Sequence, residues 1–127
     1  MLPFKQMRLL SIDVGVRNLG MCVLIKSPTS CTLKKWLVVD CAGDETVARL
    51  SIARACELVI NKLDSLEFGT VDACAIEMQP CGKVAANTKM KCVSHTIQIW
   101  ARLRFPLSHI VFINPKTKFG LEFIGKS

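Results

Sequence analysis

The sequence contains no apolar run close to the roughly 20 residues that a membrane-spanning helix requires, and no signal-like apolar core follows its first residues. Proline and glycine are modest, at five and seven of 127 residues, and we find no linker, internal repeat or low-complexity segment. These absences argue against a membrane protein and against a disordered chain. We therefore expect a single globular domain over residues 1–127 that is intracellular and not secreted.

The seven cysteines include no C-x-x-C pair, and their number is odd. Several of them lie inside apolar runs, where cysteine behaves as a small hydrophobic residue. We interpret them as reduced thiols of an intracellular protein rather than as a disulfide framework. A zinc site is the less favoured alternative.

Acidic residues are scarce in the last third of the sequence. Residues 1–81 contain nine Lys/Arg and nine Asp/Glu, whereas residues 82–127 contain eight Lys/Arg and one acid, Glu122. The net charge of +7 therefore belongs to the C-terminal third. Such an asymmetry suggests a polyanionic partner, because neutralised phosphates release condensed counterions. A solvated basic face is the alternative that charge alone leaves open.

Apolar periodicity predicts the element order β-β-β-α-β-α-β. The predicted strands are 7–14, 19–26, 33–41, 71–77 and 109–114, and the predicted helices run from an Asp44 N-cap to about Leu66 and from the 83–89 region to about Phe105. Short links make the first three strands an antiparallel meander, and right-handed crossovers add the last two in parallel. We expect an α/β fold with a five-stranded mixed sheet, strand order 3-2-1-4-5, and helices packed on it.

Two strands in this scheme end in carboxylates. Asp13 ends the first strand and Glu77 ends the fourth, so they should be neighbours at the carboxyl edge of the sheet, where open α/β sheets place their sites. A buried carboxylate favours a cationic partner, and Mg²⁺ prefers oxygen ligands. In two-metal phosphodiester hydrolysis Asp13 fits a bridging role and Glu77 a flanking one, while Gly15 would permit close approach of metal and substrate. The alternatives are a turn-forming aspartate and a strand-end carboxylate with a basic partner.

The segment Ser11–Asn18 resembles the first motif of RuvC-like Holliday-junction resolvases, especially those of poxviruses, other large DNA viruses and fungal mitochondria. Its aspartate-x-glycine core is followed by a basic residue and asparagine, Arg17 and Asn18, as in that group. Ile76–Pro80 is similar to the second motif, and Ile110–Pro115 to the fifth strand with its proline.

This resemblance implies a ribonuclease H-like fold, a homodimer, Mg²⁺ (with Mn²⁺ as a substitute) and symmetrical cleavage of four-way DNA junctions. It also implies that Asp13 and Glu77 are the first two catalytic acids. For a viral member it implies the host-cell cytoplasm or nucleus as the place of action. Members of the family continue into a final helix that carries two more catalytic carboxylates. The given sequence ends at Ser127 with Glu122 as its one acid after Glu77, so we expect either a C-terminally truncated product or a chain that binds without cleaving.

Further residues are candidates for DNA contacts or for dimer contacts. The candidates for phosphate contact are Arg17, Asn18, Lys83, Lys89, Lys91, Arg102, Arg104, Lys116 and Lys118, and those for the dimer interface are Met90, Ile97 and Trp100. Solvated positions for the former and core positions for the latter are the alternatives.

Three functions follow from these observations. A metal-dependent, structure-selective DNA endonuclease accounts for the two acids, the element order and the basic C-terminal third. A junction-binding module without catalysis accounts for the missing acid pair. A nucleotide-binding fragment of the actin-like ATPase or sugar-kinase type shares the aspartate-x-glycine hairpin, but that fold needs a second domain which 127 residues do not hold.

Overall fold

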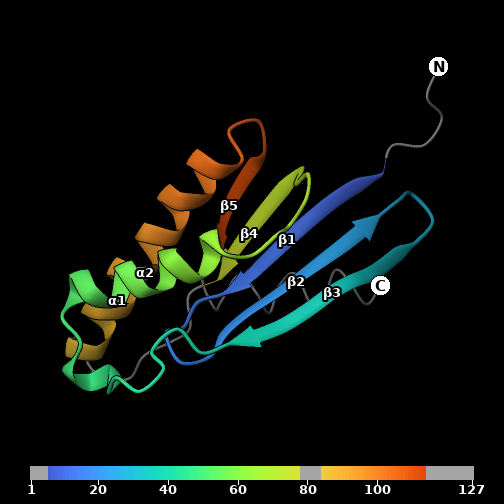
Figure 1. Cartoon of the computed structure of the whole chain (residues 1–127). Helices are drawn as coiled ribbons and strands as arrows, with labels where there is room; N and C mark the ends of the chain where they lie inside the picture. Colours follow the sequence, from blue (N-terminus) through green and yellow to red (C-terminus); the bar gives the residue numbers. More distant parts are fainter. Residues whose placement is uncertain (1–5, 78–83, 114–127) are drawn as a thin grey trace.

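The computed structural model describes residues 6–77 and 84–113, which form five strands and two α-helices in the predicted order (Figure 1). The elements are β1 (Met7–Asp13), β2 (Leu19–Lys26), β3 (Cys31–Val39), α1 (Ile52–Asp64), β4 (Ala73–Glu77), α2 (Val84–Arg104) and β5 (His109–Ile113), with a short 3-10 helix, η1 (Val47–Arg49), before α1. Within this part of the chain no helix is both long and apolar enough to cross a membrane.

The sheet has the order β3-β2-β1-β4-β5, which confirms the predicted arrangement. β1 pairs antiparallel with β2, and β2 pairs antiparallel with β3. β4 lies parallel to both β1 and β5. The chain therefore forms a meander whose first strand becomes the centre of a mixed sheet, and the carboxyl ends of β1, β4 and β5 meet at one edge.

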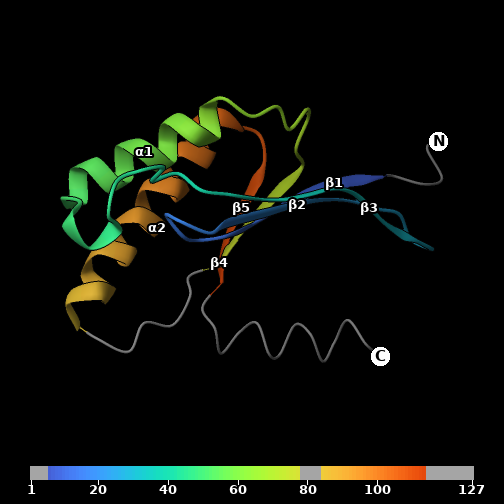
Figure 2. The same cartoon turned by 60° about the horizontal axis from the view of Figure 1, so that its bottom comes forward.

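Both described helices pack on the same face of the sheet (Figure 2). Side chains alternate across a strand, so every second residue of the central strands points to these helices. The core on this helix-covered face includes Leu10, Ile12, Met21, Val23, Cys74 and Ile76 from the strands, and Val59, Leu63, Val93 and Ile97 from the helices. No helix in the described ranges covers the opposite side, which we call the open face.

The first helix begins later than predicted. α1 begins at Ile52 and not after Asp44, and the Ser51 hydroxyl accepts a hydrogen bond of 3.0 Å from the backbone N–H of Arg54. Ser51 thus supplies the N-cap that the sequence interpretation assigned to Asp44. An ion pair of 3.0 Å between Arg54 and Glu45 ties the preceding loop to the first turn of α1.

Two residues that were candidates for a dimer interface belong to the core of the chain. Ile97 has no exposed surface and Trp100 is 6% exposed. The Trp100 ring lies edge-on to Phe68 and Phe105, with centroid distances of 6.0 and 5.6 Å, and its Nε1 donates a hydrogen bond of 2.8 Å to Asp64. Met90 is half-buried against the same core. The dimer assignment of Ile97 and Trp100 is therefore corrected, because the surface that a partner would bury is already buried.

Candidate metal and nucleic-acid site

The two predicted carboxylates lie side by side. Asp13 is the last residue of β1, Glu77 is the last residue of β4, and the parallel register pairs them directly. The backbone N–H of Val14 donates a hydrogen bond of 3.0 Å to the Glu77 carbonyl oxygen, which fastens the two strand ends together. Both side chains point to the open face, because the flanking residues Ile12 and Ile76 are buried on the helix-covered face.

This arrangement suits a divalent cation. Like charges directly opposite one another on a sheet are destabilising, and a cation between them removes that cost. The Asp13 Oδ1 atom is buried although the residue as a whole is half-buried. Mg²⁺ is held in proteins by one or two carboxylates together with waters, so the oxygen donors of Asp13 and Glu77 fit this ion. Over residues 6–77 and 84–113, however, no group of three His, Cys, Asp or Glu side chains could hold a metal.

The loop after Asp13 turns tightly toward β2. A Cβ atom on Gly15 would overlap the carbonyl oxygen of Asn18, so a side chain cannot be accommodated there without a backbone shift. Val14 and Val16 on either side are buried. The glycine thus permits the close approach of the loop to itself directly after Asp13, and its role in the approach of metal and substrate stays a prediction.

Arg17, predicted to contact DNA, is held by its own chain. Its guanidinium forms an ion pair of 2.6 Å with Asp40 and donates a hydrogen bond of 2.7 Å to the Glu45 carbonyl oxygen. Desolvation raises the pKa of Asp40, but the backbone N–H of Ala42 and the positive charge of Arg17 outweigh it, so this pKa lies below its ordinary value. Arg17 therefore ties the loop after β1 to the loop after β3, whereas Asn18 is exposed.

The other predicted cations are distributed over α2 or lie outside the described residues. Lys91 and Arg102 are exposed, Lys89 Nζ donates a hydrogen bond of 3.0 Å to the Val47 carbonyl oxygen, and Arg104 lies 3.9 Å from Asp64. Lys83, Lys116 and Lys118 fall outside the described ranges. Contact of these residues with DNA stays a prediction.

The two buried cysteines among the described residues, Cys41 and Cys74, do not offer reactive groups. All six described cysteines are free thiols. Burial raises the pKa of Cys74 to about 12 and that of Cys41 to about 11, so both are protonated near neutral pH. Neither thiol is suited to act as a nucleophile, because the reactive form is the thiolate.

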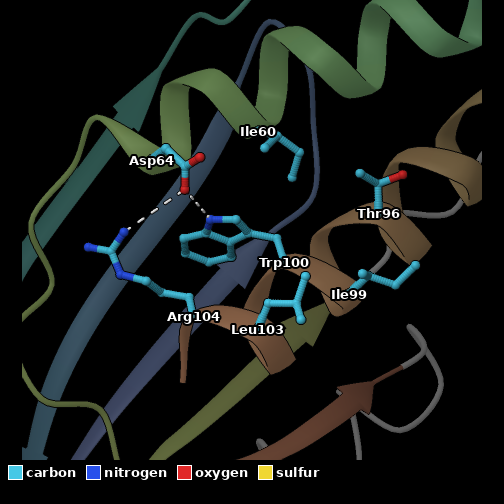
Figure 3. A pocket seen from close by; sticks show the side chains of 7 residues that line it. All are labelled: Ile60, Asp64, Thr96, Ile99, Trp100, Leu103 and Arg104. Atoms are coloured by element: carbon cyan, nitrogen blue, oxygen red, sulfur yellow. Dashed lines mark hydrogen bonds and ion pairs between the residues drawn. The ribbon is translucent and has the colours of Figure 1, made fainter. Parts of the chain in front are cut away.

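A cavity of about 400 Å³ lies in the helix layer, between α1 and α2. Figure 3 shows its lining residues: Asp64 accepts a hydrogen bond from the Trp100 indole N–H and forms an ion pair with the Arg104 guanidinium. The remaining lining side chains are Ile60, Thr96, Ile99 and Leu103. This cavity is lined by helix residues alone and includes neither carboxylate, so it is not part of the site at the strand ends.

The open face carries a residue that sequence analysis did not single out. Trp36 on β3 is 71% exposed, although tryptophan is usually buried for much of its surface. The register places it opposite Cys22, on the side of the sheet that also carries Asp13. Its position after two lysines on a predicted edge strand was the signal available in the sequence.

No protein-family model matches the sequence, and no curated protein sequence matches it either. Among solved structures, Thermus thermophilus RuvC in complex with a Holliday junction substrate is similar, with a TM-score of 0.62 and 17% identity over 87% of this chain and 66% of that chain. A second Thermus thermophilus RuvC structure has a TM-score of 0.60 and 19% sequence identity, and the match covers 86% of this chain and 64% of that chain.

The similarity to RuvC shows the fold, a ribonuclease H-like α/β arrangement, and the chain spans just under two thirds of the length of those RuvC chains. A Ppx/GppA enzyme of Aquifex aeolicus gives a TM-score of 0.48 with 15% identity over 89% of this chain and 38% of that one. That value is too low to support an argument about function.

Proposed function

We propose that this chain is a metal-dependent endonuclease that cleaves branched DNA, with four-way junctions as its substrate. The observation that carries the proposal is the direct pairing of Asp13 with Glu77 at the carboxyl edge of the open face. The fold shared with RuvC and the net charge of +7 support it. Asp13 and Glu77 are the residues that would hold Mg²⁺, and Mn²⁺ is the expected substitute.

In this reaction the chain would supply the negatively charged carboxylates and hold them in fixed positions. A bound Mg²⁺ would stabilise the negative charge that develops on the phosphate during hydrolysis. The pairing of β1 with β4 fixes the separation of the two carboxylates, and the Gly15 turn fixes the end of β1. Arg17 holds the neighbouring loop in place through Asp40. Such preorganisation matters because small displacements of catalytic groups cost large factors in rate.

A second candidate is a module that binds junctions without cleaving them. It is favoured by the finding that the described residues hold two carboxylates at the site and no third metal-ligating side chain in reach. Binding alone requires the basic surface and not a complete metal site. This candidate predicts junction binding that weakens steeply with salt and no nicks in either Mg²⁺ or Mn²⁺.

The deciding experiment follows a labelled four-way junction in Mg²⁺ and in Mn²⁺, with wild type, Asp13→Asn and Glu77→Gln. We expect paired nicks from the wild type and a loss of two orders of magnitude or more, roughly, in each variant. Glu67→Gln, an exposed carboxylate outside the site, is the control that removes one charge without touching the pair. Calorimetric Mn²⁺ binding, weakened by Asp13→Asn and not by Glu67→Gln, reports on the site independently of cleavage.

Each outcome has a distinct meaning. Nicks that persist in both site variants would overturn the role of the carboxylate pair. Junction binding by the wild type without nicks in either metal would establish the second candidate. Absence of both binding and cleavage would remove both functions.

We also propose that the active form is a homodimer, because symmetrical cleavage of a junction requires two sites related by a two-fold axis. Ile97 and Trp100 do not supply its contacts, since both are core residues. Exposed apolar side chains on the outer side of α2, Ile99 and Leu103, border the cavity between the helices and are the surface a second copy would bury. Sedimentation of the wild type beside Leu103→Glu tests this, and a monomeric wild type would contradict it.

A further inference from the structure

The open face of the sheet has an exposed aromatic side chain near the carboxylate pair. The register aligns Trp36 on β3 with Cys22 on β2 and, through it, with Ser11 on β1. Ser11 precedes Asp13 by two residues, so the two share a face and lie one step apart along the strand. Trp36 and Asp13 are therefore separated by two strand spacings and one such step, roughly 12 Å, and Glu77 on β4 lies one strand spacing farther.

Small side chains occupy the space between them. The β2 residues that separate Trp36 from β1 on this face are Gly20 and Cys22, and Gly20 lies directly opposite Asp13. No large side chain of β2 therefore stands on this face between the indole ring and Asp13. An extended ligand lying on the open face can contact both the ring and the carboxylates.

A β-bulge adds apolar surface beside the ring. The pairing of β2 with β3 shifts between Val23 and Leu24, which leaves Lys34 without a residue opposite it. Because a bulge changes the alternation of side chains, Leu33 lies on the same face as Trp36 instead of the opposite one. Leu33 and Val38 are 56% and 55% exposed. The indole thus has exposed apolar side chains beside it on the same face.

The charged side chains of the β2–β3 hairpin that carries Trp36 are all positive. Residues 19–39, the β2–β3 hairpin, contain Lys26, Lys34 and Lys35 and no acid. Lys35 Nζ points to the helix-covered side, where it donates a hydrogen bond of 3.2 Å to the Glu67 carbonyl oxygen. Lys26 and Lys34 are exposed. An exposed aromatic ring beside lysines complements a ligand that has both planar rings and negative charge.

We propose that Trp36 is a stacking platform for an unpaired nucleobase of the branched DNA whose phosphate lies at Asp13 and Glu77, with Lys26 and Lys34 contacting its backbone. Aromatic side chains in basic grooves bind single-stranded nucleic acid by base stacking, which does not depend on sequence. Paired bases in an intact duplex do not offer a free face to the ring. Trp36 then favours DNA with unpaired bases, such as those at branch points, over plain duplex. This inference rests on the proposed function.

The test measures binding in EDTA, so that cleavage does not enter, with a single-stranded thymidine oligomer, a four-way junction and a duplex. The chain has two tryptophans, and Trp100 is buried in the core, so Trp36 is the exposed reporter of stacking. We expect the oligomer to quench the wild-type fluorescence and to leave the emission of Trp36→Phe, which comes from Trp100, unchanged.

The affinity measurements use Trp36→Phe, Trp36→Ala and the control Leu107→Ala. Leu107 is fully exposed just before β5, at the opposite end of the sheet from the carboxylates. Trp36→Ala should weaken binding of the oligomer and the junction about tenfold, Trp36→Phe should weaken it less, and duplex binding should stay unchanged. Leu107→Ala should bind all three DNAs like the wild type.

Three results would overturn the platform: DNA binding without quenching, equal loss for duplex and single strand in Trp36→Ala, or unchanged affinity in that variant. A change of sedimentation in Trp36→Ala with unchanged DNA affinity would assign the surface to a contact between copies. These results are separable from failure of the proposed function. If Asp13→Asn cleaves like the wild type while Trp36→Ala loses oligomer binding, the nuclease site is wrong and the platform stands.

Discussion

The two faces of the central sheet are built from the same strands but have opposite properties. On the helix-covered face the alternate residues of β1 and β4, such as Leu10, Ile12 and Ile76, are completely buried. On the open face the intervening residues are half-buried, and two of them are the carboxylates Asp13 and Glu77. The difference shows how the alternation of side chains along a strand places apolar packing on one side of the sheet and polar side chains on the other.

This division has an energetic reason. A fully buried aliphatic side chain contributes about 1.5–3 kcal/mol, and a charged side chain in the same place would cost more than that unless paired. A carboxylate is therefore tolerated at a strand end on the side that solvent and cations can reach. We expect substitutions on the helix-covered face to affect folding and those on the open face to affect binding.

The largest difference in the free energy of unfolding is expected between the variants Ile97→Ala and Leu33→Ala. Ile97 has no exposed surface, so its truncation leaves a cavity and should lower the free energy of unfolding by about 2–5 kcal/mol. Leu33 is mostly exposed on the open face, and its truncation should change stability by less than about 0.5 kcal/mol. Denaturant unfolding followed by far-UV circular dichroism measures both values. Similar losses in the two variants would contradict the division between the faces.

The arrangement of the strands was predictable from the sequence for a physical reason, although the division between the two faces was not among the predictions. Apolar runs marked the strands, and short links with right-handed crossovers favoured one arrangement of them. The order β3-β2-β1-β4-β5 and the pairing of Asp13 with Glu77 then followed from topology alone. Both were predictable because they depend on pattern and connectivity and not on individual contacts.

Features that depend on individual side-chain contacts were not predictable. Asp44 and Ser51 are both good N-cap residues, and Ser51 is the one that caps α1, while the loop before it is joined to the helix by the ion pair between Glu45 and Arg54. Arg17 is a reasonable phosphate ligand in sequence, but β3 brings Asp40 within 2.6 Å of it. Leu33 lies on the same face as Trp36 because of a β-bulge at Lys34, and no local signal in the sequence predicts that bulge.

A smaller effect on stability is expected from substitutions of the glycines near the carboxylate edge. Gly15→Ala places a methyl group against the carbonyl oxygen of Asn18, and the required backbone shift should cost about 1–3 kcal/mol. Gly20→Ala is the matched control, because its Cβ would lie 3.5 Å from the Asp13 Cβ, an ordinary contact. Thermal and denaturant unfolding of both variants should show the loss in Gly15→Ala alone. Equal stability of the two variants would show that the loop relaxes freely and does not fix the end of β1.

The smallest effect concerns the ion pair between Arg17 and Asp40, which joins the two loops beside the site. The folded-state pKa of Asp40 lies below its ordinary value, because the Ala42 N–H and Arg17 together outweigh desolvation. A carboxyl whose pKa is lower when folded stabilises the fold above its unfolded pKa, and this contribution is lost as pH falls through the folded pKa.

We expect Arg17→Gln to raise the pKa of Asp40 toward the ordinary value, measured by NMR titration of its side-chain carboxyl carbon. Arg102→Gln, an exposed arginine on α2, should leave that titration unchanged. If Arg17→Gln also leaves it unchanged, the hydrogen bonds from the Ala42 and Gly43 backbone N–H groups hold the carboxylate, and Arg17 is available to contact DNA after all.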